Sequence, residues 1–390
     1  MTSAPVLGPA YIVAARRTAL GRPGGLHKSR RIESLTSPVV LAALEDAGLE
    51  PNAVDEIIFG NTTAGGNPGR IVGLAAGLGE SVPALTVDRQ CASGLDAILL
   101  GARAVALGEA RVVVAGGGES LSTAPWRVAR PKNVFQTPRF LGLEPEDGEA
   151  AAAPHSVTAS EKLARRLGIG RDRQDAYALQ SHLNAERAAD ERRFVREIVP
   201  LRMAAGEARD ESAEVQSLED LAELAPIVPP DGTHTHGNVS APQEGAAIAV
   251  ILAHEVWTTL GRPHALRLAA SVTQGVGASE EAGAPVAALE KLMRTNSGFS
   301  RDKLALVEMS EISAAQALAV RDAFSLEENE LNPDGGALVR GYPLGAASAV
   351  SLVRLFTRMV RTPVAGQRRF GAVTQGAIGG LGVAALFEAV

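Results

Sequence analysis

Two stretches of this 390-residue chain repeat one pattern, and the repeat limits the folds that the chain can adopt. In each stretch apolar residues recur at the spacing of one helix face, and a β-rich run that ends in glycines follows. The first face consists of Leu95, Ile98, Leu99, Ala102, Val105 and Ala106, and the second of Ala349, Leu352, Val353, Phe356, Met359 and Val360. The runs that follow are 111–118 (RVVVAGGG) and 370–380 (FGAVTQGAIGG). The match indicates an internal duplication; the alternative is two unrelated amphipathic helices that each precede a strand.

Strands and helices alternate around this repeat. Strands are predicted at 11–15, 56–60, 84–88, 111–115 and 246–253, and helices at 37–47 and 93–107. The run 111–115 is apolar throughout, which is typical of a parallel strand that is covered on both faces. The alternation predicts an α/β fold.

The pattern changes between residues 121 and 242. Prolines interrupt a polar stretch, and charged helices are predicted at 160–167 and 171–192. We interpret this region as an insertion on the surface of the core. The predicted units are an N-terminal core (1–119 and 243–264), an inserted loop domain (120–242) and a C-terminal core (265–390).

Composition excludes several classes of function. Hydrophobic residues make up 46% of the chain and charged residues 21%, so the chain can bury a large core. A net charge of −6 and an aromatic content of 4% argue against a nucleic-acid partner. Arg16 and Arg17 interrupt any N-terminal apolar segment, and no clean apolar run approaches the roughly 18 residues of a membrane span. We therefore expect no membrane partner and a cytoplasmic location.

Cys91 is the only cysteine, which excludes an internal disulfide and a cysteine-based zinc site. It lies between a predicted strand and a predicted helix. The amides and dipole at a helix N-terminus stabilise a thiolate and lower its pKa, and Ala92, Ser93 and Gly94 leave space for a substrate. These features make Cys91 a candidate nucleophile that must be reachable from solvent. The alternative is an inert, buried cysteine.

The sequence around Cys91 resembles the thiolase family, and the resemblance spans nearly the whole chain. The matching segments are 11–18 (YIVAARRT), 60–70 (GNTTAGGNPGR), 82–95 (VPALTVDRQCASGL), 114–120 (VAGGGES) and 237–247 (GNVSAPQEGAA). The resemblance implies a thiolase-like fold, in which two duplicated βαβαβαββ halves form a layered α-β-α-β-α core with an inserted loop domain that holds coenzyme A. It also implies acyl transfer from acyl-CoA through a covalent Cys91 acyl-enzyme, in a homodimer or homotetramer. Coenzyme A would be part of the substrate, with no permanently bound cofactor.

Three motifs of the family are changed in this chain. The family's Gly-His-Pro is Gly341-Tyr342-Pro343, and its Asn-Glu-Ala-Phe is Ser310-Glu311-Ile312-Ser313. The second catalytic cysteine of the family is replaced by Gly376 or Ala377, ahead of Gly379. Tyrosine has a reference pKa of about 10, against about 6.5 for histidine, so Tyr342 is a poor base but a good hydrogen-bond donor. We therefore expect acylation of Cys91 to be retained more readily than condensation.

The remaining site residues receive roles from the same resemblance. Backbone N–H groups at Cys91 and near Gly379 would form an oxyanion hole, with Ser310 beside them. Glu311 is either a buried support or an acid–base group, and these two roles stay open.

Other functions remain as alternatives to the thiolase-like acyl transfer. The enzymatic ones are thioester hydrolysis, retro-aldol cleavage and acyl transfer to a non-carbon acceptor. The last alternative is a non-catalytic acyl-CoA-binding protein.

Three residues of the insertion are candidates for contact with coenzyme A. His155 and Ser240 lie where the family contacts pantetheine, and His236 is a possible substitute base. The alternative is that His234 and His236 are loop histidines without a special role. A metal site at this His-x-His pair is not predicted, because no further ligands accompany it in the sequence.

Overall fold

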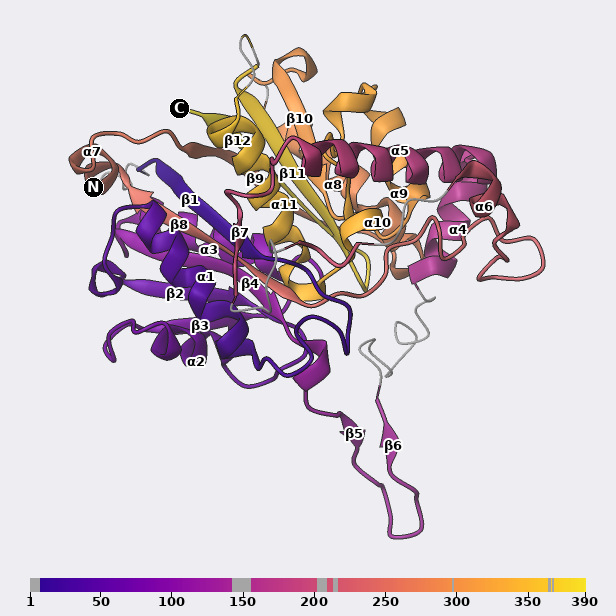
Figure 1. Cartoon of the computed structure of the whole chain (residues 1–390), viewed down its shortest axis with the longest axis horizontal. Helices are drawn as coiled ribbons and strands as arrows, with labels where there is room; N and C mark the ends of the chain where they lie inside the picture. The colour runs from indigo at the N-terminus through magenta and orange to yellow at the C-terminus, as the bar shows by residue number, and fades with distance from the viewer. Residues whose placement is uncertain are drawn as a thin grey trace, which may run out of the picture.

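The computed structural model describes residues 8–141, 156–201, 209–212, 217–296, 298–363, 366 and 368–390. Its main strands form one ten-stranded mixed sheet in the order β10-β11-β12-β9-β1-β8-β4-β2-β3, with β7 paired to β1 (Figure 1). The strands are β1 (Ala10–Thr18), β2 (Glu56–Gly60), β3 (Ala84–Val87), β4 (Val112–Glu119), β7 (Ile198–Val199), β8 (Gly245–Ala253), β9 (Leu266–Gly275), β10 (Leu304–Met309), β11 (Phe370–Ala377) and β12 (Leu381–Ala389). The sheet has two halves, which are joined by a short antiparallel contact between β1 and β9.

Helices cover both halves of the sheet and also separate them. They are α1 (Ile32–Asp46), α2 (Pro68–Ala75), α3 (Ser93–Leu107), α4 (Ser156–Leu167), α5 (Arg171–Asp190), α6 (Leu218–Glu223), α7 (His254–Thr259), α8 (Ala284–Thr295), α9 (Ala314–Ala323), α10 (Ala337–Arg340) and α11 (Ala347–Phe356). The central core joins α3 and α11 to strands of both halves. A second core lies under α1 and α2, and a third under α8 and α9. The layers therefore follow the α-β-α-β-α order that the family resemblance implies.

The predicted repeat is present, with one difference between its halves. The N-terminal half runs β1-α1-β2-α2-β3-α3-β4-β8. In the C-terminal half, the counterpart of β3 is reduced to a single parallel bridge between Val307 and Leu331. The chain that follows pairs elsewhere, because the Tyr342 N–H donates to the Ala241 carbonyl and the Tyr342 carbonyl accepts from the Gln243 N–H. These bonds tie the segment around Tyr342 to the end of the insertion instead of to β10.

Helix α3 was predicted with its observed bounds and is buried almost all round, as expected for a helix between two sheets. Its surroundings also correct the expectation about apolar runs. The 18 residues Gln90–Leu107 have the length and hydropathy of a membrane span, but 72% of this stretch is buried inside the fold. The stretch is thus accounted for as a core helix.

The insertion contributes α4, α5 and α6, which pack beside the C-terminal half, and a separate hairpin. The hairpin is formed by β5 (Val128–Ala129) and β6 (Arg139–Phe140), and it projects away from the body (Figure 1). The limits assigned to the three predicted units stay a prediction.

Candidate functional site

Cys91 lies where the two central helices begin. It follows β3 and directly precedes Ala92, the N-cap residue of α3. Gln90 has a positive φ of 51°, so the chain turns sharply into the helix. The start of α11 lies against this turn, because the Leu95 N–H donates to Ser348 Oγ at 2.9 Å. A Cβ on Gly94 would lie 2.8 Å from the Ala349 Cβ, so a glycine permits this close approach.

The expectation of an exposed, ionised Cys91 is wrong in this structure. The residue is only 2% exposed, and burial raises the pKa of its thiol to about 11. The first amides of the helix do not offset burial, because they already have acceptors: Ala92 N–H donates to the Arg89 carbonyl and Ser93 N–H to the Gln90 carbonyl. Cys91 therefore rests as a neutral thiol, since desolvation outweighs the helix dipole.

Three donors nevertheless converge on the Cys91 sulfur. They are the Tyr342 hydroxyl, the Ile378 N–H and the N–H of Cys91 itself, and each favours the thiolate. Gln375, a fully buried residue of β11, donates from Nε2 to the Tyr342 hydroxyl at 2.7 Å. A chain of donors thus runs from Gln375 through Tyr342 to Cys91. Such an arrangement stabilises negative charge that develops at the sulfur or beside it.

Tyr342 is held in place by the backbone before it. Gly341 has a φ of 84°, and a Cβ there would lie 1.8 Å from Gln243 Cγ, so only glycine fits without a shift. Burial and the neighbouring Cys91 raise the pKa of the Tyr342 hydroxyl well above its usual value. Tyr342 consequently keeps its proton and can donate a hydrogen bond.

Gly379 lies in the turn after β11, but its own N–H does not donate to the Cys91 sulfur. It donates to the Glu281 carboxylate at 3.0 Å, whereas the preceding amide, that of Ile378, donates to Cys91. The amides near Cys91 are thus those of Cys91 and Ile378. Sequence analysis expected an amide near Gly379 without choosing Ile378, and it missed Gln375 and Glu281. A signal existed for Gln375, a polar residue within the β-rich run 370–380.

Ser310 and Glu311 lie behind the site as supports. Ser310 Oγ donates to the Ala347 carbonyl at 2.8 Å, which ties the end of β10 to the start of α11. The Glu311 carboxylate accepts from Asn332 Nδ2 at 2.7 Å and from the Ala337 N–H at 3.1 Å. Burial raises the pKa of Glu311 to about 7. These contacts favour the supporting role that sequence analysis left open for Glu311.

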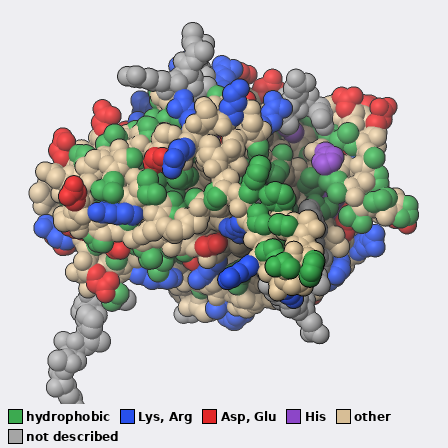
Figure 2. Space-filling model, turned by 90° about the horizontal axis from the view of Figure 1, so that it is seen from below, with side chains coloured by type: hydrophobic (Ala, Val, Ile, Leu, Met, Phe, Trp, Pro, Cys, Tyr) green, Lys and Arg blue, Asp and Glu red, His purple; other side chains and the backbone are tan. Residues whose placement is uncertain are grey.

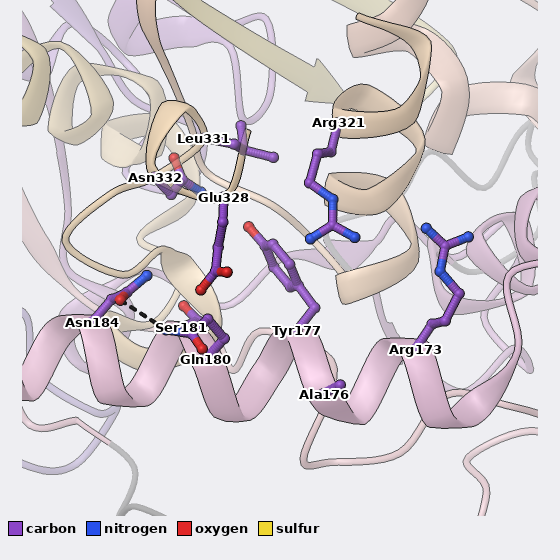
Figure 3. Close-up of a pocket in the computed structure, with 10 residues that line it drawn as sticks. All are labelled: Arg173, Ala176, Tyr177, Gln180, Ser181, Asn184, Arg321, Glu328, Leu331 and Asn332. Atoms are coloured by element: carbon purple, nitrogen blue, oxygen red, sulfur yellow. Dashed lines mark hydrogen bonds between the residues drawn. The ribbon is translucent and has the colours of Figure 1, made fainter. Parts of the chain in front are cut away.

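A pocket on the far side of Glu311 does not include Cys91. It lies between α5 and the segment that follows α9, and Tyr177 projects into it near Asn332 and Arg321 (Figure 3). Asn332, one of the residues that line this pocket, donates to the Glu311 carboxylate at 2.7 Å. The pocket is therefore linked to the support of the site and not to its sulfur.

The candidate coenzyme-binding residues differ in their surroundings. Ser240 is half-buried, and its Oγ donates to the Glu311 carbonyl at 2.5 Å, so it joins the insertion to the site. His236 is exposed. His234 is not a surface histidine: it is fully buried, with Nδ1 3.0 Å from a Glu161 carboxylate oxygen. His155 lies outside the described residues.

Comparisons with known proteins agree with this architecture. The family models for the N-terminal and C-terminal domains of thiolase match residues 10–255 and 263–389. The "Putative acetyl-CoA C-acetyltransferase VraB" of Staphylococcus epidermidis is 34% identical over 391 residues, covering 97% of each protein. The protein of the same name from Staphylococcus aureus is 32% identical, over 98% of this chain and 99% of its own.

Solved structures match over the whole fold. The acetyl-CoA acetyltransferase of Bacillus anthracis superposes with a TM-score of 0.90 at 29% identity, covering 99% of this chain and all of the other. Human mitochondrial 3-ketoacyl-CoA thiolase, solved in complex with CoA, gives a TM-score of 0.90 at 29% identity and covers 99% of both chains.

Proposed function

Because this chain belongs to the thiolase family and is an acyltransferase that acts on acyl-CoA thioesters, we propose that Cys91 carries the acyl group during the reaction. The observation that carries this proposal is the convergence of the Tyr342 hydroxyl and the Ile378 and Cys91 amides on one sulfur. These donors lower the cost of a thiolate in a buried site.

In the proposed first half-reaction, the Cys91 sulfur attacks the thioester carbonyl carbon, and the bond from that carbon to the coenzyme A sulfur breaks. The coenzyme A thiolate leaves and takes up a proton. The donors at Cys91, with Tyr342 fixed by Gln375, stabilise the negative charge that develops in this step. Because Tyr342 keeps its proton, we propose acyl transfer as the main activity and slower condensation.

Coenzyme A, as part of the substrate, is proposed to approach from the insertion. Ser240 joins that region to the Glu311 segment, and His155 and His236 are proposed to contact the coenzyme arm. No permanently bound cofactor is proposed. We also propose a cytoplasmic location.

Intact-mass measurement tests the proposal directly. After incubation with acetyl-CoA and with longer acyl-CoAs, we expect the protein to gain the mass of one acyl group, and peptide mapping should locate it on Cys91. An adduct that is discharged when free coenzyme A is added indicates a transferase, and one that is lost to water indicates a hydrolase. Tight coenzyme A binding by calorimetry without any adduct would contradict the covalent mechanism and favour a binding protein.

We propose that the chain self-associates through the hairpin β5–β6. Three apolar side chains of this segment are unusually exposed: Phe135 is 94%, Val134 91% and Trp126 85% exposed. Figure 2 shows the molecule from the side on which the hairpin projects, and hydrophobic side chains gather on this face. An exposed apolar patch of this kind is typical of an interface. The edge strand β3 and helix α2 also expose Leu85 and Ile71.

Analytical ultracentrifugation, which measures the mass of the assembly, tests the role of the hairpin. The double substitution Val134→Ser with Phe135→Ser should lower the mass of the assembly, because it removes apolar contact area without touching the core. Leu107→Ser is the control, since Leu107 is an exposed apolar residue at the end of α3. An assembly of unchanged mass in the double variant would exclude the hairpin as the contact surface.

A further inference from the structure

Two adjacent amides in the turn after β11 hold two reactive side chains. The Ile378 N–H donates to the Cys91 sulfur, and the Gly379 N–H donates to Glu281 Oε2 at 3.0 Å. The turn is tight, because Gly379 and Gly380 both have positive φ values, of 89° and 79°. Ile378 and Gly379 are consecutive in the chain, so the Glu281 carboxylate is bound one residue away from the amide that favours the Cys91 thiolate.

Glu281 lies in the 3₁₀ segment η3 (Ala278–Gly283), between β9 and α8, and is only 3% exposed. Its negative charge acts on both the Cys91 thiol and the Tyr342 hydroxyl and raises the pKa of each. Charges shift a pKa in this way when they lie within a few ångströms of the group and are poorly screened by water. The hydrogen bond to Gly379 places the carboxylate at the turn after β11, and its charge disfavours ionisation of both Cys91 and Tyr342.

Within the described part of the chain, the other polar groups discussed at the site are unsuited to accept the Cys91 proton. Tyr342 keeps its own proton, and the Gln375 side chain has no titratable group. Ser310 directs its hydroxyl to the Ala347 carbonyl. The Glu311 carboxylate is bound by Asn332 and by the Ala337 amide, behind β10. A neutral thiol in this site needs a base, and Glu281 is the carboxylate that faces it.

We propose that Glu281 is the catalytic base of the acyl-transfer reaction and takes the Cys91 thiol proton, directly or through one water, as the sulfur attacks the acyl-CoA carbonyl. This inference rests on the proposed function of Cys91. The S–H bond breaks and an O–H bond forms on Glu281, while the sulfur bonds to the carbonyl carbon. The leaving coenzyme A thiolate then takes the proton from Glu281, which restores the carboxylate.

The charged groups around Glu281 determine how the rate of Cys91 acylation should depend on pH. Cys91 and Tyr342 face it from the start of α3 and from the loop before α11. Helix α4, which packs on η3, contributes Lys162 and Arg166, and these line a separate pocket with Glu280. Arg166 is paired with Glu280 at 3.0 Å. The thiol and the tyrosine are two titratable groups whose ionisation is coupled to that of Glu281.

Glu281→Gln tests the proposal, because glutamine retains an oxygen that can accept the Gly379 N–H. We expect the rate of Cys91 acylation by acetyl-CoA, followed by quenched intact mass, to fall by about 10²–10⁴-fold at neutral pH. The variant's rate should rise about tenfold per pH unit below the thiol pKa, which the loss of the Glu281 charge lowers from about 11, since only pre-existing thiolate reacts. The wild-type rate should depend less steeply on pH. Glu281→Asp, which retains a carboxylate, should recover part of the rate and serves if the glutamine variant fails to fold.

Glu280→Gln is the matched control, because Glu280 is the neighbouring residue but is exposed and pairs with Arg166. It should acylate at the wild-type rate, and all variants should bind coenzyme A with similar affinity by calorimetry. Wild-type rates in Glu281→Gln across the pH range would overturn the role of Glu281 alone. If the wild-type protein forms no Cys91 adduct, the proposed function itself fails, so the two failures are distinguishable.

Discussion

Replacing Cys91 by serine is expected to lower kcat/KM for acyl exchange between acetyl-CoA and free coenzyme A by about 10⁴-fold or more. Serine retains the size of the side chain, so Tyr342 and the Ile378 amide keep their positions. Its hydroxyl, however, is a far weaker acid than a thiol and gives little of the anionic nucleophile. Exchange followed by isotope-labelled coenzyme A measures the effect.

Coenzyme A binding provides the control for this substitution. Calorimetry should give nearly the same dissociation constant for both proteins, because the change lies at the reacting sulfur and not along the coenzyme arm. If Cys91→Ser retained exchange within tenfold of the wild-type protein, the acyl group would have to be carried elsewhere, and the covalent role of Cys91 would be wrong.

Arg354→Met is expected to destabilise the fold by about 3–5 kcal/mol, the range found when a buried ion pair loses one partner. Arg354, on α11, is fully buried, and its guanidinium bonds to both Glu197 and Asp334. Glu197 also accepts from Arg17 at 2.8 Å, which connects this network to β1. Methionine fills much of the same volume, so the main loss is the charge, which leaves two carboxylates without this partner.

The exposed pair between Arg173 and Asp322 supplies the matched control, with 46% of each side chain exposed. Arg173→Met should cost less than about 1 kcal/mol, because water already solvates both charges. Urea unfolding of the three proteins at one pH gives both differences. Equal losses in the two variants would show that the buried network contributes no more than a surface pair.

A buried carboxyl group near Arg354 has an unusual pKa. Burial raises the pKa of Glu308, on β10, to about 8, although Arg354 and Arg340 lower it. A pKa that is higher in the folded protein than in the unfolded chain makes folding less favourable as the pH rises from about 4.5 to about 8. Sequence alone shows only a glutamate in an apolar strand, and neither its burial nor its neighbours.

Local pattern was enough to predict much of the scaffold. The bounds of α3 and β2 agree with the predictions, because the period of apolar residues reflects which face each element buries. The repeat around α3 and α11 was also visible, since both helices occupy the same central layer. The shortened third strand of the C-terminal half was not visible, because the backbone of Tyr342 pairs with residues about 100 positions earlier in the chain.

By itself, the sequence identified the family, the nucleophile candidate Cys91 and the replacement of histidine by Tyr342, since each lies within one contiguous motif. The protonation state of Cys91 and the binding of Glu281 to the turn after β11 were decided by the tertiary structure alone. A pKa depends on the water that is excluded and on the charges that face the group. At Cys91 those groups come from segments that are far apart in the chain and meet only when the two halves pack around α3 and α11.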